Sequence, residues 1–148
     1  MPQTIVYLDN RCYNRPFDDQ TQEKVHLGSE AVLSILKMGQ MKKAVIVGSE
    51  ILELEMNRMI DGNRKQKVLD LYKVAGMHIL YMDKIRKRSA YIMLVSNIRT
   101  FDSLHIAAAE EANADVLLTA DDKFEKIAGK LALKTRVINP FRFAWEVI

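Results

Sequence analysis

The chain contains one cysteine in 148 residues, Cys12, and this scarcity excludes an internal disulfide. A chain without disulfides is typical of a reducing compartment, so the cytoplasm is the expected location. No apolar run approaches the roughly 20 residues that cross a bilayer. The chain opens with Met1-Pro2-Gln3 and not with a basic, apolar leader. We therefore expect no membrane partner.

Several binding motifs are also missing. Neither G-x-G-x-x-G nor G-x-x-x-x-G-K-[ST] occurs, which disfavours a dinucleotide-binding or P-loop protein. The histidines and the cysteine do not have the spacing of a zinc site, and no Ser/His/Asp order supports nucleophilic catalysis. Internal repeats, linkers and low-complexity segments are absent, so we predict a single domain over residues 1–148.

Short apolar runs alternate with segments of helical periodicity along the whole chain. Strands are predicted at residues 4–8, 44–47, 78–81, 116–119 and 135–138, the last closed by Asn139-Pro140. Helices are predicted at 21–38 (stopped by Gly39), 50–60, 64–74, 83–95 and 122–130, whereas 10–20 is typical of a polar loop. Strands that alternate with helices predict an α/β fold, with a parallel sheet in a three-layer sandwich.

The segment RTFDSLHIAAAEEANADVLLTADDKF, residues 99–124, carries the most information. Thr100 and Asp102 precede an apolar helical run, where a helix N-terminus favours a capping oxygen and negative charge. Asn113 is suited to the left-handed conformation that ends a helix. The buried strand at 116–119 is followed by Asp121. Ligands bind at this carboxyl edge in open parallel sheets.

Four carboxylates are candidates for one site. Asp9 and Asp121 each follow a predicted buried strand, and Asp102 and Glu55 lie in or near the helices of such units. If these strands are parallel neighbours, the acids converge on one rim, where they repel each other unless a cation neutralises them. Mg²⁺ and Mn²⁺ prefer such carboxylate-rich sites. A site of this kind suits metal-assisted phosphodiester hydrolysis.

The chain resembles the PIN-domain nucleases, many of which are ribonuclease toxins of toxin–antitoxin pairs. The resemblance covers essentially the whole chain and rests on YLDNRCYNRPFDDQ, VGSEILELEM, FDSLHIAAAEEANADVLLTADDKF and VINP. Its most specific part is D-x-x-H-x-A-x-A, followed by an alanine–aspartate strand and T-x-D-x-x-F. The resemblance implies a four- or five-stranded parallel sheet between helices.

The same resemblance assigns the metal site to Asp9, Glu55, Asp102 and Asp121. It implies an endoribonuclease that uses Mg²⁺ or Mn²⁺, with RNA as substrate, an antitoxin as protein partner and a homodimer as assembly. The helix glutamate of the family stands six residues after a serine, which selects Glu55. Its competitor Glu53 lies on a different helix face, because residues two apart do not face the same point.

Other residues are candidates for contacts with the substrate. Asn10 stands where the family often has a small or hydroxyl residue, and its amide is able to bond a metal-bound water. Arg11 and Arg15 follow Asp9, so we expect one of them to contact RNA phosphate. Thr119 is expected to orient the aspartate of T-x-D or a water. The basic segments 64–67 and 84–88 are predicted to be solvated helix faces and are weaker phosphate candidates. The net charge of +3 allows a polyanionic partner without requiring one.

Each candidate also has an ordinary structural interpretation. Asp102 would be a helix cap, Glu55 a solvated helix residue, and His105 a packing or hydrogen-bonding residue. Two other functions remain open. One is a PIN-like domain that binds RNA or a protein partner without cutting. The other is an unrelated α/β domain such as a phospho-accepting receiver, which would need two adjacent acids after the first strand and a lysine after the last. Here Tyr7-Leu8-Asp9-Asn10 supplies one acid.

Overall fold

Five parallel strands form one sheet in the computed structural model, which describes residues 3–147. The spatial order is β3-β2-β1-β4-β5. Their bounds are Thr4–Leu8 (β1), Ala44–Ser49 (β2), Met77–Ile79 (β3), Val116–Leu118 (β4) and Arg136–Ile138 (β5). Every pairing is parallel, so the predicted α/β fold with a parallel sheet is confirmed, with five strands.

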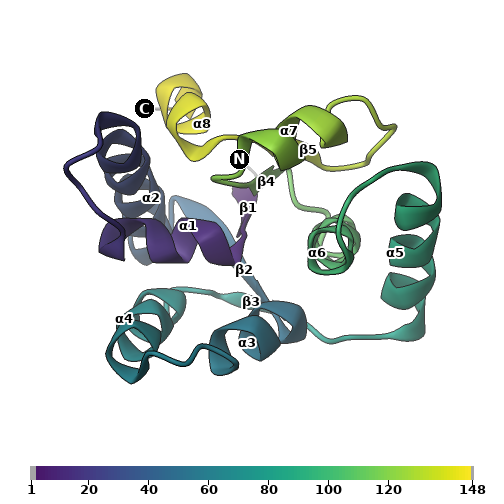
Figure 1. The fold of residues 1–148 in the computed structure, drawn as a ribbon, viewed down its shortest axis with the longest axis horizontal. Coiled ribbons are helices and arrows are strands. Elements are labelled where there is room, and N and C mark those ends of the chain that lie inside the picture. Colours follow the sequence, from purple (N-terminus) through teal and green to yellow (C-terminus); the bar gives the residue numbers. More distant parts are fainter. Residues whose placement is uncertain (1–2, 148) are drawn as a thin grey trace.

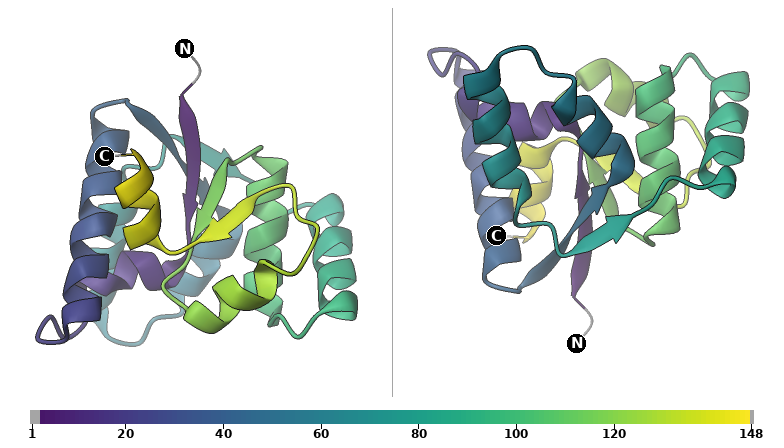
Figure 2. Two further views of the ribbon diagram at one scale, coloured as in Figure 1. Left: turned by 90° about the horizontal axis from the view of Figure 1, so that it is seen from above. Right: turned by 90° about the horizontal axis from the view of Figure 1, so that it is seen from below.

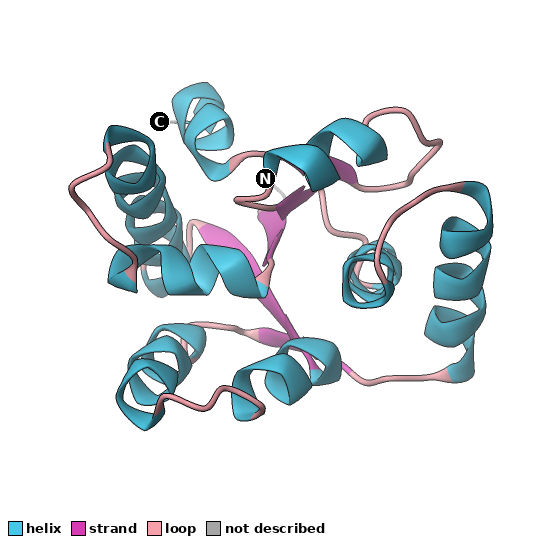
Figure 3. Cartoon of the chain, in the orientation of Figure 1, coloured by secondary structure: helices cyan, strands magenta, loops and turns pink. Residues whose placement is uncertain are grey.

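Helices cover both faces of the sheet (Figure 3). They are α1 (Asn10–Asn14), α2 (Glu23–Gln40), α3 (Glu50–Asn57), α4 (Gly62–Tyr72), α5 (Asp83–Val95), α6 (Thr100–Glu111), α7 (Asp122–Ala128) and α8 (Pro140–Val147). Helices α1, α2 and α8 lie on one side and α6 on the other, with α5 outside α6 (Figure 1; Figure 2 agrees from both further directions). Within residues 3–147, no helix combines the length and the apolar character needed to cross a bilayer.

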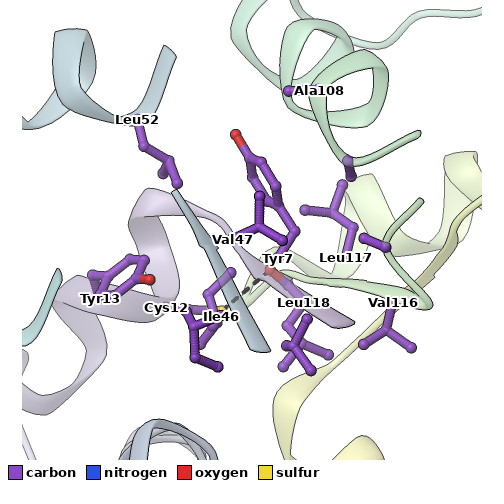
Figure 4. Close-up of a cluster of buried hydrophobic side chains, with 14 of the residues drawn as sticks. Tyr7, Cys12, Tyr13, Ile46, Val47, Leu52, Ala108, Val116, Leu117 and Leu118 are labelled. Carbon is purple, nitrogen blue, oxygen red and sulfur yellow. Dashed lines mark hydrogen bonds between the residues drawn. The ribbon is translucent and has the colours of Figure 1, made fainter. Parts of the chain in front are cut away.

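The core follows from strands that are buried on both faces. Successive side chains of a strand point to opposite faces. Figure 4 shows Tyr7, Val47 and Leu117 on the side of Ala108, and Ile46, Val116 and Leu118 on the other side. β1 and β4 pair in register up to Leu8 and Leu118, and the backbone N–H of Asp9 donates to Leu118 O at 3.0 Å. The carboxyl ends of these two neighbouring strands therefore lie level.

Two segments differ from the sequence prediction. Residues 10–20 were predicted to be a loop, but they contain α1 and a 3-10 turn over Arg15–Phe17. The Asp9 side chain caps α1, and Pro16 lies in the first turn of the 3-10 segment. Helix α8 was not predicted. Pro140 is its first residue, a position where the fixed φ of proline favours helix formation, although it was interpreted as the end of a strand.

Gly39 lies inside α2 and does not stop the helix, so that prediction was wrong. A Cβ at this position would lie 2.5 Å from Ile46 Cγ1 and 3.2 Å from Val74 Cγ2. α2 ends one residue later, at Gln40, and Lys42 takes the positive φ of 58° in the turn that follows. The absence of a side chain at Gly39 thus lets α2 approach the sheet closely.

We expect Gly39→Ala to lower the free energy of unfolding by about 1–3 kcal/mol, because the added methyl group overpacks the contact with Ile46. Helix propensity alone would make the alanine variant more stable by about 1 kcal/mol. A loss of stability would therefore indicate overpacking, and a gain would indicate helix propensity. Gly28→Ala in the same helix is the matched control, since its Cβ would meet Arg15 at 3.6–3.7 Å, an ordinary contact distance. Urea denaturation measures both variants. Equal stabilisation of both would contradict the packing role of Gly39.

Candidate active site

Two aspartates at the carboxyl ends of neighbouring strands each cap a helix with one oxygen. Asp9 follows β1, and its Oδ1 accepts the backbone N–H of Cys12 at 3.0 Å. Asp121 lies three residues after β4, and its Oδ1 accepts the N–H groups of Lys123 and Phe124 at 2.9 and 3.1 Å. Capping fixes the orientation of each carboxylate. In both residues the second oxygen, Oδ2, is directed to another partner.

That partner is the guanidinium of Arg11, which lies between three aspartates. Its Nη1 donates to Asp102 Oδ1 at 2.9 Å and to Asp9 Oδ2 at 3.2 Å. Its Nη2 donates to Asp102 Oδ2 at 3.3 Å and lies 3.5 Å from Asp121 Oδ2. The structure thus brings three of the four predicted metal-site acids together around one cationic group.

Asp102 belongs to the first turn of α6 but does not cap it. The N-cap position is Arg99, whose side chain makes no capping hydrogen bond, so the predicted capping oxygen is not found. The predicted negative charge in the first turn is confirmed, since Asp102 supplies it. Asp102 is only 6% exposed, and both of its oxygens accept from Arg11. A two-pronged pair of this kind is among the strongest ways to hold a carboxylate.

Glu55 is held by a buried chain of hydrogen bonds. Its Oε1 lies 2.5 Å from Nε2 of His105, and Nδ1 of His105 lies 2.6 Å from the hydroxyl of Tyr7. That hydroxyl in turn lies 2.7 Å from Oγ of Ser49, the N-cap residue of α3. His105 follows Asp102 by one turn of α6, so Glu55 contacts this helix one turn away from Asp102. The predicted hydrogen-bonding role of His105 is confirmed.

Glu53 has a different neighbour. Its Oε2 accepts the hydroxyl of Tyr72 in α4 at 2.7 Å, whereas Glu55 contacts α6. The two glutamates therefore point to different elements, as their spacing of two residues predicts. Of the two glutamates, Glu55 is the one that contacts α6, the helix that carries Asp102.

A sequence profile of the PIN domain matches residues 27–130, about two thirds of the chain. The chain belongs to the PIN domain family. The matched region contains Glu55, Asp102 and Asp121, whereas Asp9 and Arg11 precede it. A receiver domain is thereby excluded. No curated protein sequence matches the chain.

Two solved structures share the fold of this PIN domain. One is VapBC2 from Rickettsia felis bound to a DNA fragment from their promoter. It has a TM-score of 0.61 and 16% sequence identity, and the match covers 92% of this chain and 98% of that chain. The other is FitAB bound to an IR36 DNA fragment, with a TM-score of 0.57, 18% identity and coverage of 92% and 95%. At these identities the likeness concerns the fold.

Burial and charge oppose each other among the clustered groups of the PIN domain. Burial raises the pKa of Asp9 above its ordinary value, although the hydroxyl of Thr119 and the charge of Arg11 act to lower it. Burial lowers the pKa of Arg11, but its hydrogen bond to Asp102 and the neighbouring negative charges outweigh burial and raise it overall. Arg11 is therefore a permanent cation beside a carboxyl group that is costly to ionise.

The predicted substrate-contacting residues lie around this cluster. Thr119 is buried, and its Oγ1 accepts the backbone N–H of Asp121 at 3.1 Å, an orienting contact of the predicted kind. A hollow of about 320 Å³ lies beside the cluster, lined by Asn10, Arg11, Asn14, Arg15, Asp18, Arg64 and Ala120. Asn10 accepts from Asn14, and Arg15 pairs with Asp18 at 3.4 Å. The lining is thus basic, with polar amides beside it.

The basic helix segments have structural partners. Arg88 holds α5 to α6 through two hydrogen bonds to Glu110, at 2.7 and 3.1 Å. Lys84 pairs with Glu111 at 3.2 Å, and Arg64 pairs with Asp18 at 3.0 Å. Arg64, Lys84 and Arg88 therefore have ion-pair partners within the protein, and Arg64 also lines the basic hollow.

The donor set matches a site for Mg²⁺ or Mn²⁺. Three carboxylates, without a thiolate or imidazole among them, already share one positive group, which shows that their oxygens converge on a cation. As they stand, no three Asp, Glu, His or Cys side chains within residues 3–147 enclose a metal position. Arg11 lies between the aspartates instead. The carboxylate ligands are of the kind that a divalent metal binds. In this structure the same carboxylates contact the guanidinium of Arg11.

Proposed function

We propose that this PIN domain is a divalent-metal-dependent endoribonuclease, with Mg²⁺ or Mn²⁺ held by Asp9, Asp102, Asp121 and Glu55. The observation that carries the proposal is the convergence of three aspartates on one cationic group at the carboxyl ends of β1 and β4. Ligands bind at this edge in open parallel sheets. Membership of the PIN domain family, which the sequence resemblance associates with nucleases, supports the same function.

Each acid has a defined part in this proposal. Asp9 and Asp121 present Oδ2 to the centre while their helix caps fix Oδ1. Asp102 closes the site from α6, and Glu55 approaches from α3 with its carboxylate oriented by His105. A metal ion bound by these groups supplies an activated water and stabilises the charge that develops on the phosphate.

We propose RNA as the substrate and the basic hollow as the place where its backbone lies. Asn10, Arg11 and Arg15 line this hollow next to the aspartates, so a phosphate bound there would lie beside the metal. Contacts of arginine to phosphate position a strand without reading its sequence. Their affinity falls as the salt concentration rises.

We further propose that the protein is a cytoplasmic toxin with an antitoxin as its partner. The resemblance to toxin ribonucleases and the fold shared with VapBC2 and FitAB support this assignment. We also propose self-association as a homodimer. Helix α5 is the outermost helix beside α6 (Figure 1). It exposes the apolar side chains of Tyr91, Leu94 and Val95, and contact between two copies would cover such a surface.

RNA cleavage by the purified protein with Mn²⁺, with Mg²⁺ or with EDTA tests the function. We expect cleavage with either metal and its loss in EDTA, because water activation depends on the metal. Asp102→Asn, purified in the same way, controls for contaminating nucleases.

Equal cleavage by both proteins would mean a contaminant or a misplaced site. If the wild-type protein did not cleave RNA but bound it in a salt-sensitive manner, the result would favour a PIN domain that binds without cutting.

A further inference from the structure

The guanidinium of Arg11 contacts the carboxylate oxygens that a shared metal ion would need. Its Nη1 contacts Asp102 Oδ1 and Asp9 Oδ2 at the same time, at 2.9 and 3.2 Å. The other oxygen of Asp9 is already used as a helix cap, so Oδ2 is the oxygen it has available for a cation. The same holds for Asp121, whose Oδ2 lies 3.5 Å from Nη2.

A metal ion and this guanidinium position exclude each other. Mg²⁺ binds oxygen at about 2.0–2.1 Å, whereas Nη1 lies 3.2 Å from Asp9 Oδ2 and 2.9 Å from Asp102 Oδ1. An ion bound to both oxygens on this side would therefore lie well inside the contact distance of Nη1. Two cations at such a separation repel strongly. Binding of the metal therefore requires the Arg11 side chain to move out.

The surroundings allow that movement. The Arg11 side chain is 36% exposed, and it lines the hollow of about 320 Å³ that opens beside the aspartates. The residue lies in the first turn of α1, where rotation of its side chain leaves the backbone and the Asp9 cap in place. The displaced guanidinium would then lie on the side where the RNA backbone is proposed to bind.

We propose that Arg11 takes the place of the metal in the metal-free protein and competes with the divalent ion, so that this residue sets the metal affinity of the site. The inference rests on the metal centre of the proposed function. A binding-competent state that is populated only in part lowers the apparent affinity in proportion to its population. An ion-paired state favoured ten to one over the open state therefore weakens metal binding about tenfold.

Mn²⁺ binding without RNA tests the proposal, measured by electron paramagnetic resonance of the free ion and by calorimetry. Arg11→Gln is expected to bind Mn²⁺ about tenfold more tightly than the wild-type protein. Arg11→Lys should fall between them, because a compact ammonium does not span three carboxylates as a planar guanidinium does.

Arg99→Gln is the matched control for charge alone. The exposed Arg99 lines the small cleft that also contains Asp102 and Asp121, and no ion pair of Arg99 occurs within residues 3–147. The Arg99→Gln substitution removes one positive charge near the acids but leaves the guanidinium of Arg11 between them. We expect its Mn²⁺ affinity to stay within about twofold of the wild-type value, because exposed charges are largely screened.

Thermal unfolding gives a second measurement that detects a folding defect. In EDTA, Arg11→Gln should melt below the wild-type protein, because its three acids have lost their shared cation. Saturating Mn²⁺ should raise its melting temperature by more than it raises that of the wild-type protein.

If the wild-type protein binds Mn²⁺ and Arg11→Gln binds it no more tightly, Arg11 is not a competitor and the inference is wrong, although the metal centre stands. An equal gain in Arg99→Gln would also overturn it, because charge alone would then explain the effect. If neither protein binds Mn²⁺, the metal centre itself fails and the inference fails with it.

Discussion

Asp121→Asn is expected to remove metal-dependent RNA cleavage while the fold stays intact. The amide oxygen of asparagine still accepts the N–H groups of Lys123 and Phe124, and Asn caps helices about as well as Asp. What the variant loses is the charge of the oxygen that faces Arg11. Loss of a residue that only orients a metal ligand typically lowers metal affinity or activity by about 10–100-fold. Loss of a direct ligand should therefore lower the cleavage rate by more than about 100-fold.

Asp61→Asn is the matched control for this variant. Asp61 caps α4 in the same manner, accepting the N–H groups of Asn63 and Arg64 at 3.1 and 3.2 Å, but it is exposed and belongs to a different helix. Asp121→Ala adds the contrast for stability, because it also loses the cap, at a cost of about 1 kcal/mol. Initial cleavage rates and urea denaturation separate the two roles. Wild-type cleavage by Asp121→Asn would show that the charge of this residue is not needed.

The positions of Asp9 and Asp121 could be predicted because each follows a short apolar run of the kind that forms a buried strand. Parallel strands place the residues that follow them on one edge of the sheet, where ligands bind. The helix cap that Asp9 forms was not predicted, because residues 10–20 were interpreted as a loop. β1 and β4 turned out to be neighbours in register, which brings both aspartates to one centre. The helix caps use Oδ1 of each aspartate, and Oδ2 of each faces Arg11, so the caps do not conflict with the proposed metal site, which stays a prediction.

Arg11 was expected beside the site, but its pairing with the aspartates could not be predicted, for a local reason. Residues 10–20 have no apolar periodicity and were interpreted as a loop, in which the direction of a side chain is undefined. Once Asp9 caps α1, the residue two positions later lies in the first turn and its long side chain folds back over the cap. The sequence feature that indicates the pairing is Asp-x-Arg directly after a strand. It indicates that the arginine contacts the aspartate only if a helix starts at that point.

The Glu55 pairing illustrates a second limit. Helical spacing separated the faces of Glu53 and Glu55, and this separation is confirmed by their contacts with Tyr72 and His105. Spacing does not reveal which neighbour each face meets, because that depends on how α3 and α6 pack. Gly39 shows the same limit, since glycine is frequent both at helix ends and at close contacts between elements.

We expect His105→Ala to lower the free energy of unfolding by about 3 kcal/mol. The ring is fully buried, so its removal leaves a cavity in the core. It also takes one partner from the buried hydroxyl of Tyr7, which keeps only the contact with Ser49. Glu55 loses its partner as well, and because its side chain is 23% exposed it is free to turn to solvent. Cleavage should therefore fall about 10–100-fold under conditions where the variant remains folded.

A double-mutant cycle with Tyr7→Phe separates packing from the hydrogen-bonded chain. Removing the hydroxyl alone should cost about 1–3 kcal/mol, because Ser49 and His105 lose a buried partner. Tyr7 and His105 are in contact, so the change in unfolding free energy of the double variant should differ from the sum of the two single changes by about 0.5–3 kcal/mol. His26→Ala, at an exposed position of α2, should change stability by less than about 0.5 kcal/mol. Strict additivity would mean that the chain does not act as a unit. A destabilised His105→Ala with undiminished cleavage would show that His105 supports the core without orienting Glu55.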